Sequence, residues 1–421
     1  MRLLYVCHAP PCPPALGPAR RHYPIVREAS KRHDVTLVSF GTASDERRFH
    51  EHLPGACRNA VFVDMRRCLP VKAAQRAYFL LTGRTDFRRL YAARFQRAID
   101  EVSRGGPFDV VMISTVMLAR YQLPPAPCLG DTHNVEHEVC RRAANEAHDV
   151  GRRLYFRLQT RLTRREEQIC ASRVQFISTT SHRDREQFAR WVPADRIFVI
   201  PNVVDVEAFA RPESAPPRDE PTVVFTGMMS YYPNVHAARA LCEEVLPRVA
   251  AVYPRMRMVI AGANPPAWLT RLRDRRVVVT GSVDDMRPWL WNATVFAMPL
   301  KIGGGTRLKA LEAMAARVPI VSTSLGCEGL NVIDGREALL RDDPAAFADA
   351  VVQLIGSETL RRRIADAAFD MVSARFDLRA AGRALDAALF AVANPRGRAV
   401  VRNPHCGIGQ EVRGSLECGS H

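Results

Sequence analysis

The sequence predicts an α/β protein with two doubly wound, Rossmann-like domains that face a central cleft. Strand-like runs alternate with helical runs along the chain, which is typical of parallel sheets covered by helices. A chain of 421 residues is too long for one ordinary core. A segment rich in proline and charge, residues 207–221, divides it into halves of similar size. Ligands of such proteins usually bind in the cleft between the domains.

The expected domains follow from these runs. We expect the first domain over residues 1–206, a linker over 207–221 and the second domain over 222–393. The candidate strands of the first domain are RLLYVC, VTLVSF, FDVVMI, PCLGDT, VQFIST and IFVIP. Those of the second are TVVFTG, MRMVIAG, RVVVTG, TVFAMP and PIVST. The polar tail, residues 394–421, lacks hydrophobic periodicity and is expected to be disordered.

The amino-acid composition limits the classes of protein to which this chain can belong. A hydrophobic content of 47% with 25% charged residues is typical of a globular protein. No run of eighteen apolar residues occurs, and the first apolar run is too short for a signal peptide, so we expect a cytoplasmic location. The eleven cysteines include no C-x-x-C pair, which argues against a disulfide framework or a thiolate zinc site.

The segment from Pro299 to Thr323 carries the strongest functional signal. Its glycines Gly303, Gly304 and Gly305 would let a ligand approach the backbone closely. We expect Thr306 to cap a helix of about three turns. The N-terminal amides and the dipole of that helix would favour an anion such as a phosphate.

Charged residues follow these glycines. Arg307 and Lys309 add positive charge to the first turn, against the usual preference for acidic residues there. Glu312 lies farther along and offers a carboxylate to neutral hydroxyls. Together these residues predict a site for a sugar nucleotide. The alternative is a glycine-rich turn that only packs tightly, and the loop matches neither the Walker pattern nor G-x-G-x-x-G.

The phrase ALEAMAARVPIVST resembles the C-terminal signature of family 4 of the retaining glycosyltransferases, which have the GT-B fold. Those enzymes carry two glutamates, of which Glu312 matches the second, whereas Gly304 stands in place of the first. Arg317 replaces the usual glycine of the phrase. The resemblance implies a nucleotide-diphosphate sugar as donor, retention of anomeric configuration, and no required metal or other cofactor.

The resemblance also implies roles for Gly17, Gly227 and Ser282. Gly17 lies in the loop after the first strand, which receives the acceptor in similar enzymes, and Arg20 and Arg21 follow it. A solvated, proline-rich loop is the alternative there. Gly227 lies where the diphosphate is expected, although the Arg and Lys that usually follow it are absent. Ser282 lies in GSVDD, which matches the loop that holds the nucleotide base.

His133, Glu136 and His137 match H-x-x-E-H, a zinc peptidase pattern. In a helix, both histidines would lie on one face beside the glutamate. Residues 127–131 read instead as a strand that runs into a turn, which places His133 at a strand end. The resemblance implies that a histidine there contacts the donor sugar or supports its developing positive charge. A buried structural histidine and a zinc ligand are the alternatives.

Two basic helical stretches, residues 72–97 and 152–165, mix arginine with aromatic residues in a chain of net charge +16. They would suit an anionic membrane surface and a lipid-linked acceptor, and a solvated arginine-rich face is the alternative. No recognition module for nucleic acid is visible, so we expect no such partner.

These observations predict a glycosyltransferase of polysaccharide or glycolipid biosynthesis that acts on a glycan or lipid-linked acceptor. His133, Arg307 and Lys309 are the expected catalytic residues. The expected substrate-binding residues are Gly17, Gly227, Ser282, Gly303, Gly304, Gly305, Thr306 and Glu312. The rivals are a sugar-nucleotide epimerase of the same fold, a zinc hydrolase built on His133, Glu136 and His137, and a non-catalytic nucleotide-binding protein.

Overall fold

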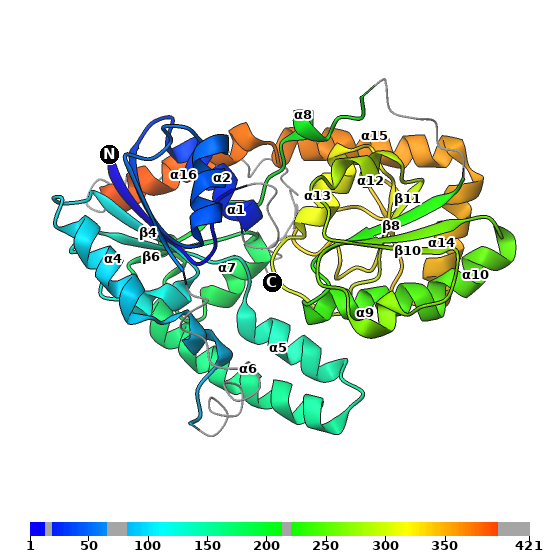
Figure 1. Ribbon diagram of the computed structural model, residues 1–421, viewed down its shortest axis with the longest axis horizontal. Helices are drawn as coiled ribbons and strands as arrows, with labels where there is room; N and C mark the ends of the chain where they lie inside the picture. The colour runs from blue at the N-terminus through cyan, green and yellow to red at the C-terminus, as the bar shows by residue number, and fades with distance from the viewer. Residues whose placement is uncertain (13–18, 65–81, 213–219, 395–421) are drawn as a thin grey trace, which may run out of the picture.

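Two α/β domains lie side by side, each built on a parallel sheet with helices around it (Figure 1). The computed structural model describes residues 1–12, 19–64, 82–212 and 220–394, and the structural statements below concern these residues. Gly17, the tail from residue 395 and parts of the linker and of the basic stretch 72–97 lie outside them.

The first sheet has seven strands in the order β3-β2-β1-β4-β5-β6-β7. Its strands are β1 Arg2–Cys7, β2 Asp34–Phe40, β3 Asn59–Val63, β4 Val110–Ser114, β5 Cys128–Asp131, β6 Phe176–Thr179 and β7 Ile197–Val199. Every residue of β4 is buried, because helices cover both faces of a doubly wound sheet. The strand order reverses between β1 and β4, where such folds bind their ligands.

The second sheet has six strands in the order β10-β9-β8-β11-β12-β13. Its strands are β8 Thr222–Thr226, β9 Arg257–Ala261, β10 Val277–Gly281, β11 Val295–Met298, β12 Ile320–Ser322 and β13 Leu339–Leu340. All strands predicted from the sequence are present in the two sheets. Two strands were not predicted: β3, which is half-buried at the sheet edge, and β13, which has two residues.

Helices connect the strands. Those of the first half are α1 Ala19–Ala29, α2 Ala43–His52, α4 Ala93–Ser103, α5 Glu136–Asn145, α6 Val150–Ala171, α7 His182–Phe188 and α8 Val206–Phe209. Those of the second half are α9 Tyr232–Ala240, α10 Leu246–Val252, α11 Ala267–Thr270, α12 Arg287–Trp291, α13 Leu308–Ala315, α14 Pro344–Gly356, α15 Glu358–Arg375 and α16 Leu378–Ala393. The 3₁₀ turns are Asp86–Leu90, Val116–Arg120 and Ala194–Arg196, and Leu241–Val245 is a π-helical turn.

Side-chain caps fix where several of these helices begin. Thr42, Asp149 and Asp343 each accept a hydrogen bond from a backbone N–H in the first turn of α2, α6 and α14. Such caps satisfy amides that have no partner within the helix. None of the helices described is both long and apolar enough to cross a bilayer.

The last helix departs from the expected division of the chain. We expected residues 222–393 to form one domain, but α16 packs against α1, β4 and β5 of the first sheet. Its Leu385, Leu389 and Val392 belong to the same apolar cluster as Leu3 and Tyr5 of β1. The second domain therefore ends with α15, and α16 crosses back to the first domain (Figure 1). The sequence pattern shows that α16 is amphipathic, but not which sheet covers its apolar face.

Candidate active site

A cavity of about 510 Å³ lies between the two domains at the carboxyl ends of both sheets. This volume is within the range of small-molecule sites. His8 and His133 line it from the loops after β1 and β5, and Gly227 and Lys309 line it from the second domain. The predicted cleft is therefore present, and both domains contribute polar groups to it.

The glycine loop after β11 contacts the first domain directly. Gly303 and Gly304 line the cavity. Gly305 has φ of +64°, and a Cβ atom on it would lie 2.1 Å from the carbonyl oxygen of His133. The sequence predicts that a ligand approaches the backbone at these glycines. At Gly305 the close neighbour is the backbone of the other domain.

We expect Gly305→Ala to lower the free energy of unfolding by about 2–4 kcal/mol, because the side chain is strained and overlaps His133. Gly335→Ala is the matched control, since Gly335 has a similar φ of +76° but nothing within 4 Å of its Cβ position. Its expected loss is about 1 kcal/mol. Equal losses in denaturant unfolding would show that the contact with His133 does not matter.

The helix after the loop begins later than predicted. Arg307 is at the N-cap of α13, which has eight residues and no side-chain cap. Thr306 does not cap this helix, because its hydroxyl is hydrogen-bonded to Asn202 of the first domain. Asn202 Nδ2 donates to Thr306 Oγ1 at 2.9 Å. Asn202 lines the cavity and joins the two domains there.

Arg307 lines the cavity but is engaged with its own loop. Its guanidinium donates hydrogen bonds to the carbonyl oxygens of Gly304 and Gly305. The side chain is buried, and this burial lowers the pKa of Arg307 to about 10. Arg307 therefore holds the shape of the glycine loop.

Lys309 lines the cavity beside the glycine loop. It lies in the first turn of α13, where its Nζ donates to Asn234 Oδ1 at 2.7 Å and lies 4.2 Å from the ring centre of Phe225. Burial lowers its pKa well below the usual value for lysine, and nearby Arg20 adds to this effect. An anion in the cavity would reverse the shift by stabilising the charged form.

Gly227 makes room for this lysine. A Cβ atom at Gly227, which has φ of +155°, would lie 2.7 Å from Lys309 Nζ and 2.6 Å from Asn234 Nδ2. Ser282 is exposed and does not belong to the described lining of the cavity, so its role in binding a base is not supported by position.

Glu312 is buried and paired with the opposite domain. Arg20 Nη1, from α1, donates to Glu312 Oε2 at 2.7 Å. Burial raises the pKa of Glu312, and the charge of Arg20 opposes this rise. We expected this carboxylate to face ligand hydroxyls, but in the structure it accepts a hydrogen bond from Arg20.

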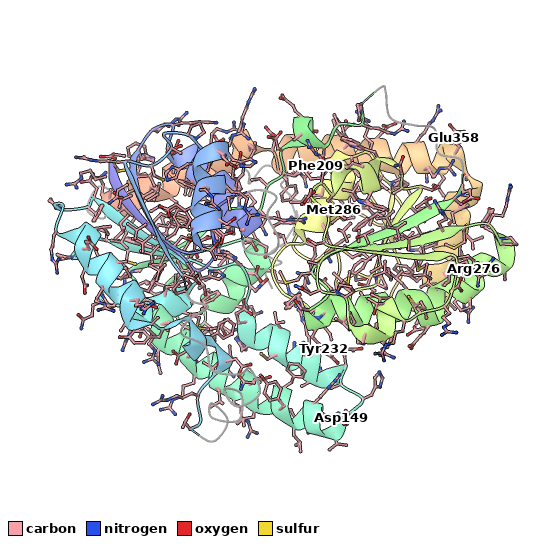
Figure 2. The ribbon with its side chains drawn as sticks, viewed as in Figure 1. Asp149, Phe209, Tyr232, Arg276, Met286 and Glu358 are labelled. Carbon is pink, nitrogen blue, oxygen red and sulfur yellow. The ribbon has the colours of Figure 1, made fainter. Side chains whose placement is uncertain are left out.

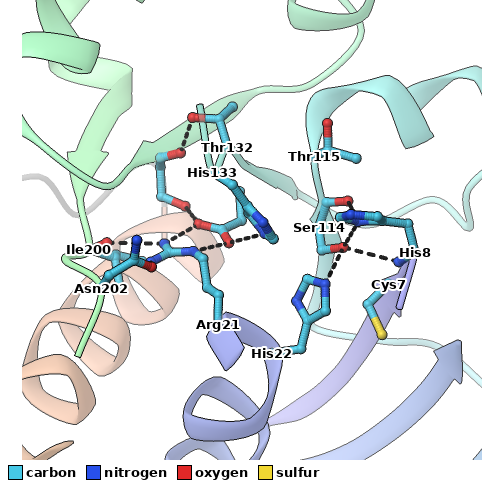
Figure 3. Close-up of polar contacts among 12 residues, drawn as sticks. Cys7, His8, Arg21, His22, Ser114, Thr115, Thr132, His133, Ile200 and Asn202 are labelled. Carbon is cyan, nitrogen blue, oxygen red and sulfur yellow. Dashed lines mark hydrogen bonds and ion pairs between the residues drawn. The ribbon is translucent and has the colours of Figure 1, made fainter. Parts of the chain in front are cut away.

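Arg21 lines the cavity and also joins elements of the first domain. Its guanidinium donates to both carboxylate oxygens of Asp131, at 2.7 and 2.5 Å, and to Asn202 Oδ1 at 3.0 Å (Figure 3). Arg21 is 3% exposed and Asp131 is fully buried. This pair joins α1 to the end of β5, next to His133.

His133 lies at the end of β5, as the sequence predicted, and lines the cavity. Its ring faces those of His8 and His22 (Figure 3). Burial lowers the pKa of His133 and of His22 well below the usual value for histidine, so both rings are neutral near pH 7.

The zinc alternative at H-x-x-E-H is wrong. His133 precedes α5, so the pattern does not lie on one helix face. His137 lies in the first turn, where its Nδ1 is 2.6 Å from Glu167 Oε2. Among the described residues, neither Glu136 nor His137 belongs to a group whose ligand atoms lie close enough to share an ion.

Further contacts hold the domains together. Arg142 of α5 donates to the carbonyl oxygen of Gly303 at 2.6 Å and to Glu328 at 2.8 Å. Tyr232, labelled in Figure 2, stacks on Phe156 of α6 with ring centres 5.4 Å apart. These contacts were not predicted, because no local sequence pattern indicates them. His8 could have been noticed, since it directly follows the first strand.

Comparison with known proteins identifies the family of both halves. The family "Glycosyltransferase Family 4" matches residues 17–208, and "Glycosyl transferases group 1" matches residues 220–357. The chain belongs to the family 4 and group 1 glycosyltransferases. The resemblance seen in the sequence is thus confirmed. This glycosyltransferase has the GT-B fold, with a Rossmann-like domain on each side of the cleft.

Individual relatives of this glycosyltransferase are distant. A protein described as an uncharacterized 44.6 kDa protein in the cps region of Klebsiella pneumoniae is 19% identical, over 83% of this chain and 89% of its own. The phosphatidyl-myo-inositol mannosyltransferase of Mycobacterium leprae is 29% identical, over 42% of this chain and about half (49%) of its own length. The structure of Anabaena HepE in complex with UDP-glucose is similar in fold, with a TM-score of 0.67 at 15% identity, over 93% of this chain and all of that one.

Proposed function

We propose that this glycosyltransferase moves a sugar from a nucleotide-diphosphate donor to a glycan or lipid-linked acceptor, with retention of anomeric configuration. The observation that carries the proposal is the half-buried Lys309, which lines the cavity beside a glycine loop while His133 lines it from the other domain. A cation and backbone amides can stabilise a diphosphate, and a neutral imidazole can hydrogen-bond to a sugar hydroxyl.

The departing diphosphate is the species that Lys309 stabilises. Charge develops on the leaving oxygen as the bond to the sugar breaks, and a preorganised cation in a cavity that excludes water lowers the energy of that state. Arg307 contributes by holding the loop carbonyls of Gly304 and Gly305, which keeps the loop amides in place.

His133 acts on the sugar. As a neutral ring it donates one hydrogen bond and accepts another, so it orients a sugar hydroxyl without adding positive charge beside the developing cation. Retention requires the acceptor to approach from the face that the diphosphate leaves. We place the acceptor on the first domain, near the loop that contains Gly17.

Glu312 binds the donor once Arg20 releases it. We expect Glu312→Ala to weaken nucleotide affinity by about 1–3 kcal/mol, because a charged hydrogen-bond acceptor is lost. Calorimetric titration with the best nucleotide measures this change. Glu358→Ala, in the first turn of α15, is the control and should bind normally. Unchanged affinity in Glu312→Ala would remove this carboxylate from the site.

The donor is found by thermal unfolding with UDP, GDP, ADP and their sugars, each with and without a chelator. A ligand at one hundred times its dissociation constant adds about 2.7 kcal/mol, which raises the melting temperature by several degrees. We expect one base to stabilise the protein and the chelator not to lower the transfer rate. Product NMR then reads the anomeric configuration, and an inverted product would overturn retention.

The same assay separates the rival functions. Gly304 stands where related transferases carry a glutamate, which keeps a sugar-nucleotide epimerase as the second candidate. An epimerase converts its donor with no acceptor present. A binding protein is stabilised by nucleotide without turnover.

We propose that α6 brings the protein to an anionic membrane. This helix exposes Val150, Leu154 and Leu158 beside arginines that include Arg157 and Arg161, so apolar and cationic groups share its surface. Leu154→Glu with Arg157→Glu is expected to lower binding to phosphatidylserine vesicles at least tenfold. Leu272→Glu with Arg271→Glu, an exposed pair on the second domain, is the control. Equal binding by both variants would exclude α6.

A further inference from the structure

Three histidines from separate elements lie together, and two of them, His8 and His133, line the cavity. His8 follows β1, His22 lies in α1 and His133 follows β5 (Figure 3). Their ring centres are 5.2 Å apart for His8 and His22, 5.4 Å for His8 and His133, and 4.9 Å for His22 and His133. One ligand nitrogen from each ring lies within 4.8 Å of the other two. In the described part of the chain, no other group of three His, Cys, Asp or Glu residues has its ligand atoms this close together.

Neighbouring groups orient two of these rings. His8 Nδ1 lies 3.2 Å from the carbonyl oxygen of Ser114 and 2.9 Å from its hydroxyl. A carbonyl only accepts, so His8 Nδ1 carries the proton and Nε2 carries the lone pair. His22 Nδ1 is bonded to the Tyr5 hydroxyl at 2.8 Å, and its Nε2 points toward Ser114 Oγ at 3.4 Å. Such second contacts are what fix the ring orientation of histidine ligands.

The third ring supplies a nitrogen without a hydrogen bond. His133 Nε2 is buried, and the described residues give it no hydrogen-bond partner; Asp131 Oδ2, at 3.7 Å, is too far. A buried polar atom without a partner is costly. The neighbouring Asp131 carboxylate is already paired with Arg21, so it does not provide a hydrogen-bond partner for His133 Nε2.

We propose that His8, His22 and His133 form a binding site for a transition-metal dication of the Zn²⁺ type, with a fourth position open to the cavity. Three imidazole nitrogens select such ions over Mg²⁺ or Ca²⁺, which prefer oxygen ligands. Bonds of about 2.0–2.1 Å place tetrahedral ligand atoms roughly 3.4 Å apart, so nitrogens that now lie within 4.8 Å of one another must move closer. His8 and His133 follow β1 and β5, so this movement falls on the loops after these strands.

Metal at this site would oppose sugar transfer, and this part of the inference rests on the proposed function. A bound ion occupies the His133 lone pair, which is then lost to the sugar. The ion would therefore inhibit transfer in competition with the donor. This site differs from the H-x-x-E-H pattern, since it shares only His133 with it.

The test uses the full chain, first stripped by a chelator and then given Zn²⁺ or Co²⁺ without any nucleotide. We expect one metal ion per chain after gel filtration, and a visible Co²⁺ spectrum typical of a four-coordinate nitrogen site. His8→Phe and His133→Phe should each lower metal affinity at least tenfold. His236→Phe, which changes a histidine outside the cluster, is the matched control.

The outcomes are distinct. Equal metal affinity in His8→Phe, His133→Phe and His236→Phe would overturn the site, as would wild-type protein that retains no metal. Because His8→Phe and His133→Phe test the site independently, the test remains valid if one of these variants fails to fold. Metal bound at the cluster in a protein without transfer activity would contradict only the proposed function. Transfer activity without metal binding or Zn²⁺ inhibition would contradict only this inference.

Discussion

Lys309→Met is expected to lower the turnover number about 10²–10³-fold, equivalent to about 2.7–4 kcal/mol of transition-state stabilisation. The change removes the amino group of Lys309 beside the glycine loop but keeps a side chain of similar length over the ring of Phe225. Burial disfavours the charged form of Lys309, so folding should not suffer. Turnover with the preferred donor and the melting temperature measure the two effects separately.

Lys301→Met is the control for this experiment. Lys301 lies in the same loop but is not among the residues described as lining the cavity. Its loss should change turnover less than twofold. A normal rate in Lys309→Met would mean that the diphosphate binds elsewhere. A collapse of stability in Lys309→Met would mean that its bond to Asn234 is structural.

Asp131→Ala is expected to lower the free energy of unfolding by about 3–5 kcal/mol, because it leaves the Arg21 guanidinium buried without its carboxylate. The hydrogen bond from Ser178 Oγ to Asp131 Oδ1, 2.7 Å long, is lost as well. For a domain of this size, the melting temperature should fall by roughly 6–20 °C. Denaturant unfolding gives the free energy directly.

Two further variants test whether the loss of stability in Asp131→Ala comes from the buried ion pair. Asp366→Ala breaks an ion pair with Arg317 in which both side chains are at least half exposed, and should cost less than about 1 kcal/mol. Arg21→Met combined with Asp131→Leu removes both charges and should recover part of the lost stability. If Asp131→Ala costs no more than Asp366→Ala, the pair does not hold α1 to β5.

The sequence was a good guide wherever the signal is local. The run FDVVMI predicted β4 because its apolar residues are contiguous, and a contiguous run is what a strand buried on both faces requires. The end of PCLGDT likewise placed His133 at the carboxyl edge of the sheet. The missed β3, NAVFV, is half-buried at an edge, where tertiary pairing decides more than composition.

Long-range contacts account for the errors at the site. Thr306 reads as a helix cap, but Asn202 takes its hydroxyl from the other domain. Glu312 reads as an available carboxylate, but Arg20, 292 residues away in sequence, pairs with it. Neither Asn202 nor Arg20 can be identified from the spacing of residues in the sequence. A contact between domains produces no periodic sequence pattern.

By itself, the sequence determined the two parallel sheets, the glycine loop with Lys309 and the position of His133, since each depends on residues adjacent in the chain. Only the tertiary structure decided that α16 returns to the first sheet, that Arg20 covers Glu312 and that His8 and His22 join His133. The physical reason is that strands and turns are formed by neighbours in sequence, whereas a binding cleft is formed by side chains that only the packing of the two domains brings together.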